Sequence, residues 1–120
     1  MNKTEKRMKI FTLIMQVIMN IVDNAIKYTE DDGHVTFTVR TNDRHLYISV
    51  ADNGPGISDS DKKKIFDRFY RVDKARTRQK GGFGLGLSLA QQIVLALKGT
   101  IVVKDNHPKG TIFEVKITGV

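Results

Sequence analysis

Asn20-Ile-Val-Asp-Asn-Ala-Ile-Lys-Tyr28 is the stretch of this 120-residue chain that decides its fold class. It ends a run, residues 5–28, whose apolar residues recur with the 3.6-residue period of a helix. Asn20, Asn24 and Lys27 are spaced i, i+4 and i+7, so they project from one face of that helix. Two amides and an ammonium on a mostly apolar face are costly to bury unless each has a partner.

Two interpretations of this polar face stay open on the residues alone. In one, the three side chains are hydrogen-bond partners of one another at the end of a helix. In the other, they form a magnesium–phosphate site, because an amide oxygen is a neutral ligand suited to a hard cation that keeps waters and nucleotide oxygens.

The rest of the chain predicts an α+β domain. Alternating apolar residues predict strands over 34–40, 45–51, 100–104 and 111–118. A short helix is expected over 59–69 with Ser58 as its N-cap, and another over 85–97, closed by Gly99. Residues 70–84, charged and ending in glycines, read as a long loop of the kind that serves as a lid. Helices and strands in this order favour a two-layer sandwich with helices on one sheet face.

Two glycine motifs flank this lid segment. Asp52-Asn-Gly-Pro-Gly56 ends the second strand abruptly, either as a simple tight turn or with the carboxylate on a pocket floor and glycines that let backbone pass close to a ligand. Gly81-Gly-Phe-Gly-Leu-Gly-Leu87 opens a helix, and glycine-rich backbone at a helix N-terminus is a recurrent anion cradle. Its spacing matches neither a P-loop nor a Rossmann fingerprint.

Composition sets the remaining bounds. The length suits one domain, residues 1–120, and the absence of cysteine excludes disulfides and thiolate metal sites. No uninterrupted apolar run approaches the roughly 18 residues that span a bilayer. Segment 61–80 has nine basic and three acidic residues and so holds +6 of the net +7 charge. Nucleic acid and nucleoside polyphosphates are both polyanions that such a segment would attract, and charge alone does not separate them.

Taken in order, the three motifs resemble the N, G1 and G2 boxes of the histidine-kinase branch of the GHKL ATPase superfamily. Residues 65–73, Ile-Phe-Asp-Arg-Phe-Tyr-Arg-Val-Asp, resemble its F box, and residues 66–89 are most similar to sensor kinases of Gram-positive bacteria. The resemblance covers roughly residues 10–118. It implies a Bergerat fold: a mixed sheet with helices on one face, and ATP held with Mg²⁺ under a mobile lid.

The resemblance also implies a role for each matching residue. At the metal and phosphate end, Asn24 would be the main magnesium ligand with Asn20 beside it, and Lys27 would meet phosphate oxygens. Arg71 would approach the terminal phosphate, where a guanidinium can brace charge during transfer. The phosphates would be wrapped by the backbone of Gly82, Gly84, Leu85 and Gly86.

At the adenine end, Tyr28 would stack on the base. Asp52 would accept a hydrogen bond from the adenine amino group, with Gly54 and Gly56 shaping the pocket.

Asn20 separates the branches of this superfamily. Relatives that hydrolyse ATP have a glutamate there to activate water, and an amide has no useful basicity near neutral pH. The sequence therefore favours a protein histidine kinase that positions the γ-phosphate for a histidine. Three alternatives remain. A hydrolysing ATPase fragment would need an acid at position 20, and a basic nucleic-acid-binding domain without enzyme activity would leave Asn20, Asn24 and the glycines as coincidence. An ATP-binding module that has lost kinase function is disfavoured by the intact motifs.

The expected phosphoacceptor is not supplied by this sequence. His34, His45 and His107 do not precede an acidic residue on a helix, so we expect them to be ordinary surface residues. The chain is then expected to bind ATP without phosphorylating itself, and to act on the dimerisation and phosphohistidine domain of its own kinase and, through it, on a response regulator. No nucleic-acid partner is expected. We expect a cytoplasmic domain, not itself inserted in a membrane, of a membrane-bound sensor kinase.

Overall fold

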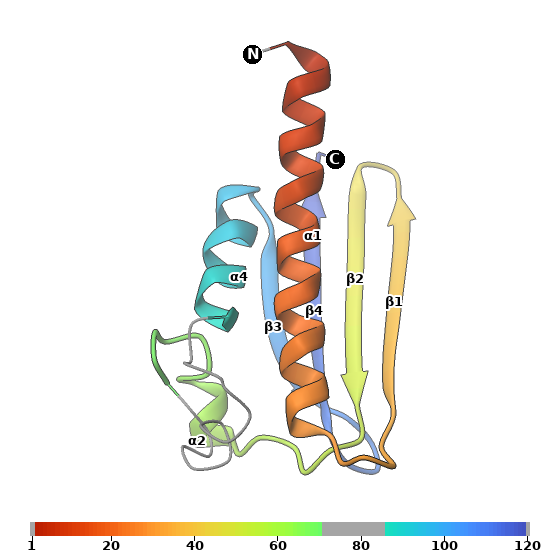
Figure 1. Ribbon diagram of the computed structural model, residues 1–120, viewed down its shortest axis with the longest axis vertical. Helices are drawn as coiled ribbons and strands as arrows, with labels where there is room; N and C mark the ends of the chain where they lie inside the picture. The colour runs from red at the N-terminus through yellow and green to blue at the C-terminus, as the bar shows by residue number, and fades with distance from the viewer. Residues whose placement is uncertain (1, 71–85, 120) are drawn as a thin grey trace.

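The computed structural model describes residues 2–70 and 86–119, and every structural statement below refers to these residues. Two helices lie side by side on one face of a four-stranded sheet (Figure 1). The elements in chain order are α1 (Lys3–Tyr28), β1 (Val35–Asn42), β2 (His45–Asp52), α2 (Asp59–Lys62), α4 (Gly86–Ala96), β3 (Thr100–Asp105) and β4 (Thr111–Thr118). The two-layer α/β sandwich is therefore confirmed.

The strand order is β1-β2-β4-β3, and all three strand pairs in the described residues are antiparallel. The expectation of a mixed sheet is wrong for this part of the chain. β2 and β3 do run in the same direction, but β4 lies between them and pairs with both. No parallel pair forms as a result. β4 thus brings the end of β2 next to the β3–β4 turn, which matters for the site.

The core lies between the helices and the inner face of the sheet. Alternate residues of each strand point inward, so Ile48 and Val50 of β2 and Phe113 and Val115 of β4 are at most 2% exposed. Burying one such side chain contributes about 1.5–3 kcal/mol. The helical residues that pack on them are Val17, Ile21 and Ala25 of α1 and Ala90 and Val94 of α4.

α1 is longer than the expected 5–28 and less buried at its start. It begins at Lys3, with Asn2 as N-cap accepting from the Glu5 amide at 2.8 Å. Figure 1 shows its first turns extending beyond the end of the sheet, so they have nothing to pack against. Phe11, one of the apolar residues of this stretch, is 65% exposed. By length and composition α1 is also long and apolar enough to cross a membrane. The core helix of a soluble protein can meet the same criterion.

α2 is shorter than the expected 59–69. Ser58 is its N-cap as expected, accepting from the Asp61 amide at 3.1 Å, but the helix ends at Lys62. From there successive i→i−3 turns replace helix, and Phe69 has a left-handed φ of 66°. The consecutive residues Ile65 and Phe66 explain the change: Ile65 is buried and Phe66 packs edge-on against Phe113 at 6.3 Å, so both are held by the core.

α4 ends as expected at a glycine, but not through the glycine's own conformation. Lys98 takes the left-handed φ of 61°, and the Gly99 amide donates to the Val94 carbonyl at 2.8 Å. A Cβ on Gly99 would lie 2.3 Å from the Lys116 carbonyl oxygen of β4. Glycine is therefore required here because the chain passes so close to the sheet.

Candidate functional site

The end of α1 and the loop after β2 meet at one end of the sheet. Gly54 is buried there, and a Cβ on it would lie 2.6 Å from the Tyr28 carbonyl oxygen and 3.2 Å from Asp52 Oδ1. Only glycine lets the loop pass this close to the helix. Of the predicted adenine-end residues, Asp52 and Gly54 are thus brought next to Tyr28, from which they are separated in the sequence by β1 and β2.

Asp52 is the buried carboxylate of this cluster, with 6% of its surface exposed. Its Oδ1 accepts from the amides of Gly54 at 2.9 Å and Thr111 at 3.2 Å. Burial raises the pKa of this carboxyl above its ordinary value, and the two backbone hydrogen bonds oppose that rise. Within residues 2–70 and 86–119, no donor reaches Oδ2. An ionised carboxylate is an acceptor only, so Oδ2 is suited to an amino group of a ligand.

The loop that carries Asp52 is clamped from two sides. Asn53 Oδ1 accepts from the His34 amide at 2.8 Å, which ties the loop to the start of β1. Asn106, in the β3–β4 turn, donates from Nδ2 to the Asp52 carbonyl oxygen at 2.8 Å. Gly110 in the same turn has φ 112°, and a Cβ there would lie 1.9 Å from that oxygen. Gly56, the last glycine of the motif, also has a left-handed φ, 82°.

The side chains on the polar face of α1 do not bond to one another, so the first sequence interpretation is wrong. Asn20 Oδ1 accepts from Gln16 Nε2 at 2.9 Å, and Asn20 Nδ2 donates to the carbonyl oxygen of Gly86, the first residue of α4, at 3.2 Å. Asn20 therefore bonds to neither Asn24 nor Lys27. Asn24 is half-buried and has no polar partner in the described part of the chain. Lys27 forms an ion pair with Asp23 at 3.0 Å.

These contacts leave the side-chain amide of Asn24, but not that of Asn20, available to a ligand. Both ends of the Asn20 amide are already hydrogen-bonded. The Gly86 carbonyl oxygen can only accept, so the Asn20 nitrogen must face it and the Asn20 oxygen faces Gln16. It joins α1 to the N-terminus of α4. Asn24, one turn further along α1, keeps its side-chain oxygen for a ligand. Among the described residues there is no cluster of three His, Cys, Asp or Glu that would hold a metal by itself.

Several predicted residues lie outside the described chain. They are Arg71, Gly82, Gly84 and Leu85, together with all of the lid segment except Tyr70. Tyr70 donates from its hydroxyl to Asp61, and this hydrogen bond raises the pKa of Tyr70 and lowers that of Asp61. The F box residues before it are fixed by the core contacts of Ile65 and Phe66.

The sequence analysis did not predict three residues that contact the site, Gln16, Asn106 and Thr111. Gln16 lies four residues before Asn20, so helical spacing alone would have placed the two side chains together. Asn106 and Thr111 carried no such signal, because they reach Asp52 only through the pairing of β4 with β2.

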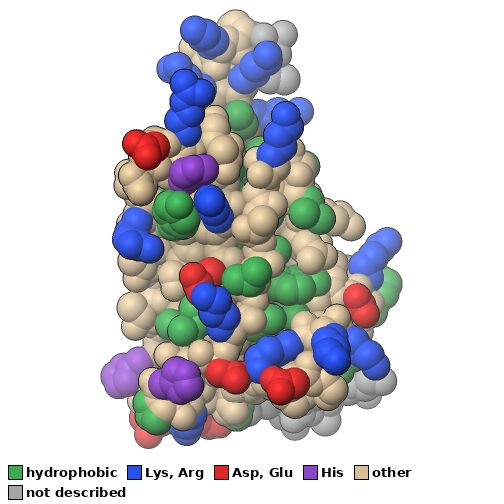
Figure 2. Space-filling model, turned by 180° about the vertical axis from the view of Figure 1, so that it is seen from behind, with side chains coloured by type: hydrophobic (Ala, Val, Ile, Leu, Met, Phe, Trp, Pro, Cys, Tyr) green, Lys and Arg blue, Asp and Glu red, His purple; other side chains and the backbone are tan. Residues whose placement is uncertain are grey.

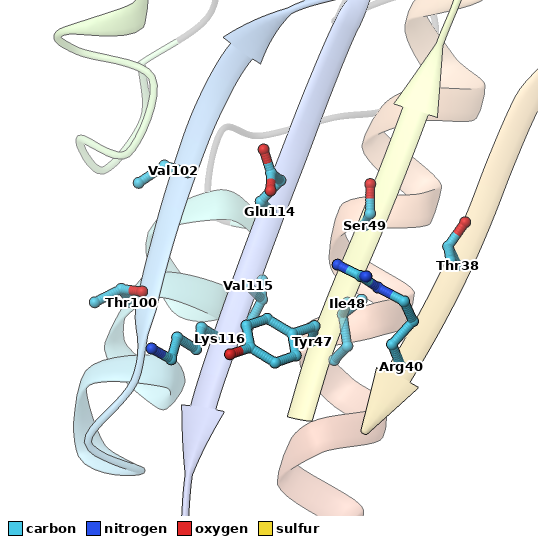
Figure 3. A pocket seen from close by; sticks show the side chains of 10 residues that line it. All are labelled: Thr38, Arg40, Tyr47, Ile48, Ser49, Thr100, Val102, Glu114, Val115 and Lys116. Carbon is cyan, nitrogen blue, oxygen red and sulfur yellow. The ribbon is translucent and has the colours of Figure 1, made fainter. Parts of the chain in front are cut away.

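A hollow on the opposite face of the sheet was also not predicted (Figure 3). Tyr47 lies in it with Arg40 at 5.7 Å and Lys116 at 5.8 Å from its ring centroid, on the neighbouring strands β1 and β4. Figure 2, from behind, shows this face with basic side chains spread between exposed apolar ones. The sheet separates this hollow from the α1–α4 layer, so it is not part of the Asp52 site.

None of the three histidines lies in a helix, as expected. His34 and His107 are exposed, and His45 is half-buried at the start of β2, with its Nδ1 3.1 Å from the Thr118 hydroxyl.

Comparison with known proteins places the site in context. Residues 11–119 match the family model described as histidine kinase-, DNA gyrase B-, and HSP90-like ATPase. The chain is 71% identical over 105 residues to the sensor protein CiaH of Streptococcus pneumoniae, and 53% identical over 100 residues to the sensor histidine kinase WalK of Bacillus subtilis. Both matches agree with the expected likeness to Gram-positive sensor kinases.

Solved structures agree with the fold. The mycobacterial sensor histidine kinase MprB has a TM-score of 0.77 at 31% identity, with 90% of this chain and 73% of that one covered. The catalytic domain of the histidine kinase ThkA has a TM-score of 0.77 at 30% identity, with 90% and 67% covered. The CiaH and WalK matches cover 88% and 82% of this chain but only 24% and 16% of the relatives. The chain thus spans a quarter or less of the length of these sensor proteins.

Proposed function

Because the chain belongs to the histidine kinase-, DNA gyrase B- and HSP90-like ATPase family, we propose that it is the ATP-binding catalytic domain of a two-component sensor histidine kinase. Residues 1–120 form one domain that binds ATP with Mg²⁺ and presents the γ-phosphate to a histidine on a separate helical domain.

The observation that carries the proposal is the half-satisfied carboxylate of Asp52. Two backbone amides hold one oxygen and leave the other for a ligand donor in a buried setting. Adenine offers an exocyclic amino group as donor, whereas guanine offers a carbonyl oxygen at the corresponding place. A buried acceptor left facing an acceptor is penalised, so Asp52 selects ATP over GTP. Tyr28, at the end of α1, stacks on the base, and Gly54 and Gly56 keep the pocket open.

The metal and phosphate end is assigned to the polar face of α1. Asn24 is the main magnesium ligand, because its amide is available in the described structure. Asn20 belongs to the same site but serves chiefly to hold the start of α4, through Gly86, against α1. Lys27 meets phosphate oxygens. Arg71 braces the terminal phosphate during transfer, and the backbone of Gly82, Gly84, Leu85 and Gly86 wraps the phosphates.

Transfer to a histidine is favoured over hydrolysis by the chemistry of Asn20. Its amide has no basicity for activating water, and both of its ends are engaged by Gln16 and Gly86. Phosphoryl transfer depends mainly on positioning and charge stabilisation, so bound ATP without a correctly placed nucleophile is nearly inert. The isolated chain therefore binds ATP and neither hydrolyses it quickly nor phosphorylates itself.

The partners follow from this role. The immediate partner is the dimerisation and phosphohistidine domain of the same kinase, and a response regulator receives the phosphoryl group from it. The domain works in the cytoplasm as part of a membrane-bound sensor protein.

Calorimetric titration with ATP and GTP in the presence of Mg²⁺ tests the proposal. Wild-type chain should prefer ATP, and Asp52→Asn should reduce that preference by about 1–3 kcal/mol, the range for a hydrogen bond to a charged group. Asp43→Asn is the matched control, since Asp43 is exposed in the β1–β2 turn at the other end of the sheet. Equal affinity of the wild-type chain for ATP and GTP would contradict the assignment of Asp52.

A further inference from the structure

An exposed apolar stripe runs along the N-terminal part of α1. The stripe consists of Met8, Phe11, Met15 and Met19, which are 66%, 65%, 39% and 63% exposed. Their spacing of three, four and four residues places them in one row along the helix. The row lies on a different side of α1 from the core residues, so packing of the domain itself does not cover it. A contiguous row of exposed apolar side chains is a feature of interaction surfaces.

Basic residues surround the start of the stripe. Lys3, Lys6, Arg7 and Lys9 are all exposed, against Glu5 alone among residues 3–12. Glu5 is engaged with Asn2, and none of the four cations pairs with a carboxylate in the described chain. These turns project beyond the sheet (Figure 1), so neither the sheet nor α4 covers them.

We propose that the projecting turns of α1 bind an anionic lipid surface. Apolar side chains with flanking lysines and arginines suit a helix that lies in the membrane interface, with the stripe at the acyl boundary and the cations among the headgroup phosphates. The cations favour this partner over parallel pairing with a second copy of the chain. They point to several sides of the helix, so parallel pairing of two α1 helices through the stripe would crowd eight of them at one end, whereas an anionic surface neutralises them.

This role is separate from nucleotide binding. The start of α1 and the end of β2, where Asp52 lies, are at opposite ends of the molecule (Figure 1). A lipid surface held by the stripe therefore leaves the Asp52 site accessible, and it fixes which end of the domain faces the membrane.

Flotation of the 120-residue chain with vesicles tests the proposal, using phosphatidylcholine vesicles with and without phosphatidylglycerol. We expect binding only when phosphatidylglycerol is present. Replacing Lys6 and Lys9 together by alanine should weaken binding by about 30-fold, from roughly fivefold for each lysine near an anionic surface. Phe11→Glu should weaken it at least as much. Circular dichroism checks that these exposed substitutions leave the fold intact.

Matched controls separate the stripe from general charge and hydrophobicity. Leu95→Glu alters an apolar residue of α4 that is 60% exposed, and replacing Lys63 and Lys64 by alanine removes two exposed lysines elsewhere. Both controls should bind vesicles like the wild type. The proposal is overturned if the chain does not float with anionic vesicles, or if Phe11→Glu binds as well as Leu95→Glu. It is also overturned if the chain forms dimers that Phe11→Glu abolishes, since the stripe would then be an interface between copies.

Discussion

Replacing Gly54 by alanine tests the contact on which the site is built. In the structure a Cβ at this position would lie 2.6 Å from the Tyr28 carbonyl oxygen, whereas ordinary contacts begin near 3.4 Å. The loop and the end of α1 must therefore separate by about 0.8 Å. Overpacking of this kind costs about 1–3 kcal/mol, which corresponds to a loss of roughly 4–12 °C in melting temperature for a domain of this size.

The same displacement should weaken ATP binding. Asp52 and Tyr28 lie on the two sides of the contact, so moving them apart spoils the simultaneous hydrogen bond and stacking that we assign to them. We expect a loss of tenfold or more in affinity, because 1.4 kcal/mol already corresponds to tenfold. Thermal unfolding measures the stability change, and calorimetry below the lowered melting temperature measures the affinity.

Gly86→Ala is the matched control for stability. Here the nearest atom of residues 2–70 and 86–119 to a new Cβ is the Asn20 Cβ at 3.9 Å, an ordinary contact, and the residue starts α4. Alanine should leave the fold unstrained and stabilise it by about 0.4–1 kcal/mol through the unfolded chain. A weaker affinity for ATP in this stable variant would then report directly on the close approach of phosphate to the α4 N-terminus. Unchanged melting temperature and unchanged ATP affinity in Gly54→Ala would refute the packing described here.

Substitutions at three side chains probe single groups. ATP affinity should fall as pH is lowered through the raised pKa of Asp52, because protonation removes the charge that strengthens acceptance from the amino group, and Asp52→Asn should flatten this part of the profile; an unchanged profile would show that another group titrates. Asn24→Ala should bind ATP with little dependence on Mg²⁺ in calorimetry, whereas a normal magnesium response would remove Asn24 from the metal site. Gln16→Leu and the isosteric Gln16→Glu both lose the donor to Asn20, worth about 0.5–1.5 kcal/mol, and should weaken ATP binding by a few-fold in calorimetry; wild-type affinity in both would mean that Asn20 holds its position unaided.

The sign of the Asp52 effect on stability is opposite to that of most carboxyls. Burial raises its pKa in the folded state, so the folded chain binds this proton more tightly than the unfolded chain does. The contribution of Asp52 to the free energy of unfolding therefore falls as pH rises from its ordinary pKa through the raised one. Asp52→Asn should remove that dependence.

Periodicity and motif order were enough to predict the layers, most element bounds and the family. The α1 pattern and the alternation in β2 and β4 are set by local burial, which a sequence displays directly. The end of α2 was predicted wrongly because Ile65 and Phe66 are held by tertiary contacts, including that of Phe66 with Phe113 of β4, and these override helix continuation.

The site was predictable only as far as its motifs extend. Asp52 and Gly54 were identified through the resemblance of their motif to the G1 box, because the residues alone also allowed a simple tight turn. The clamp by Asn106 and Thr111 depends on β4 inserting beside β2, a long-range pairing that no local pattern reports. The role of Asn20 in joining α1 to α4 likewise depends on where Gly86 lies in space.

Transfer from radiolabelled ATP tests the central claim most directly. The chain is incubated with ATP labelled on the γ-phosphate, first alone and then with the histidine-bearing helical domain of its kinase. We predict no rapid phosphate release and no label on the chain alone, then label on the histidine of the added domain. Transfer should be slow, because the two domains are not tethered. Rapid phosphate release without the partner, or strong labelling of His34, His45 or His107, would contradict the account.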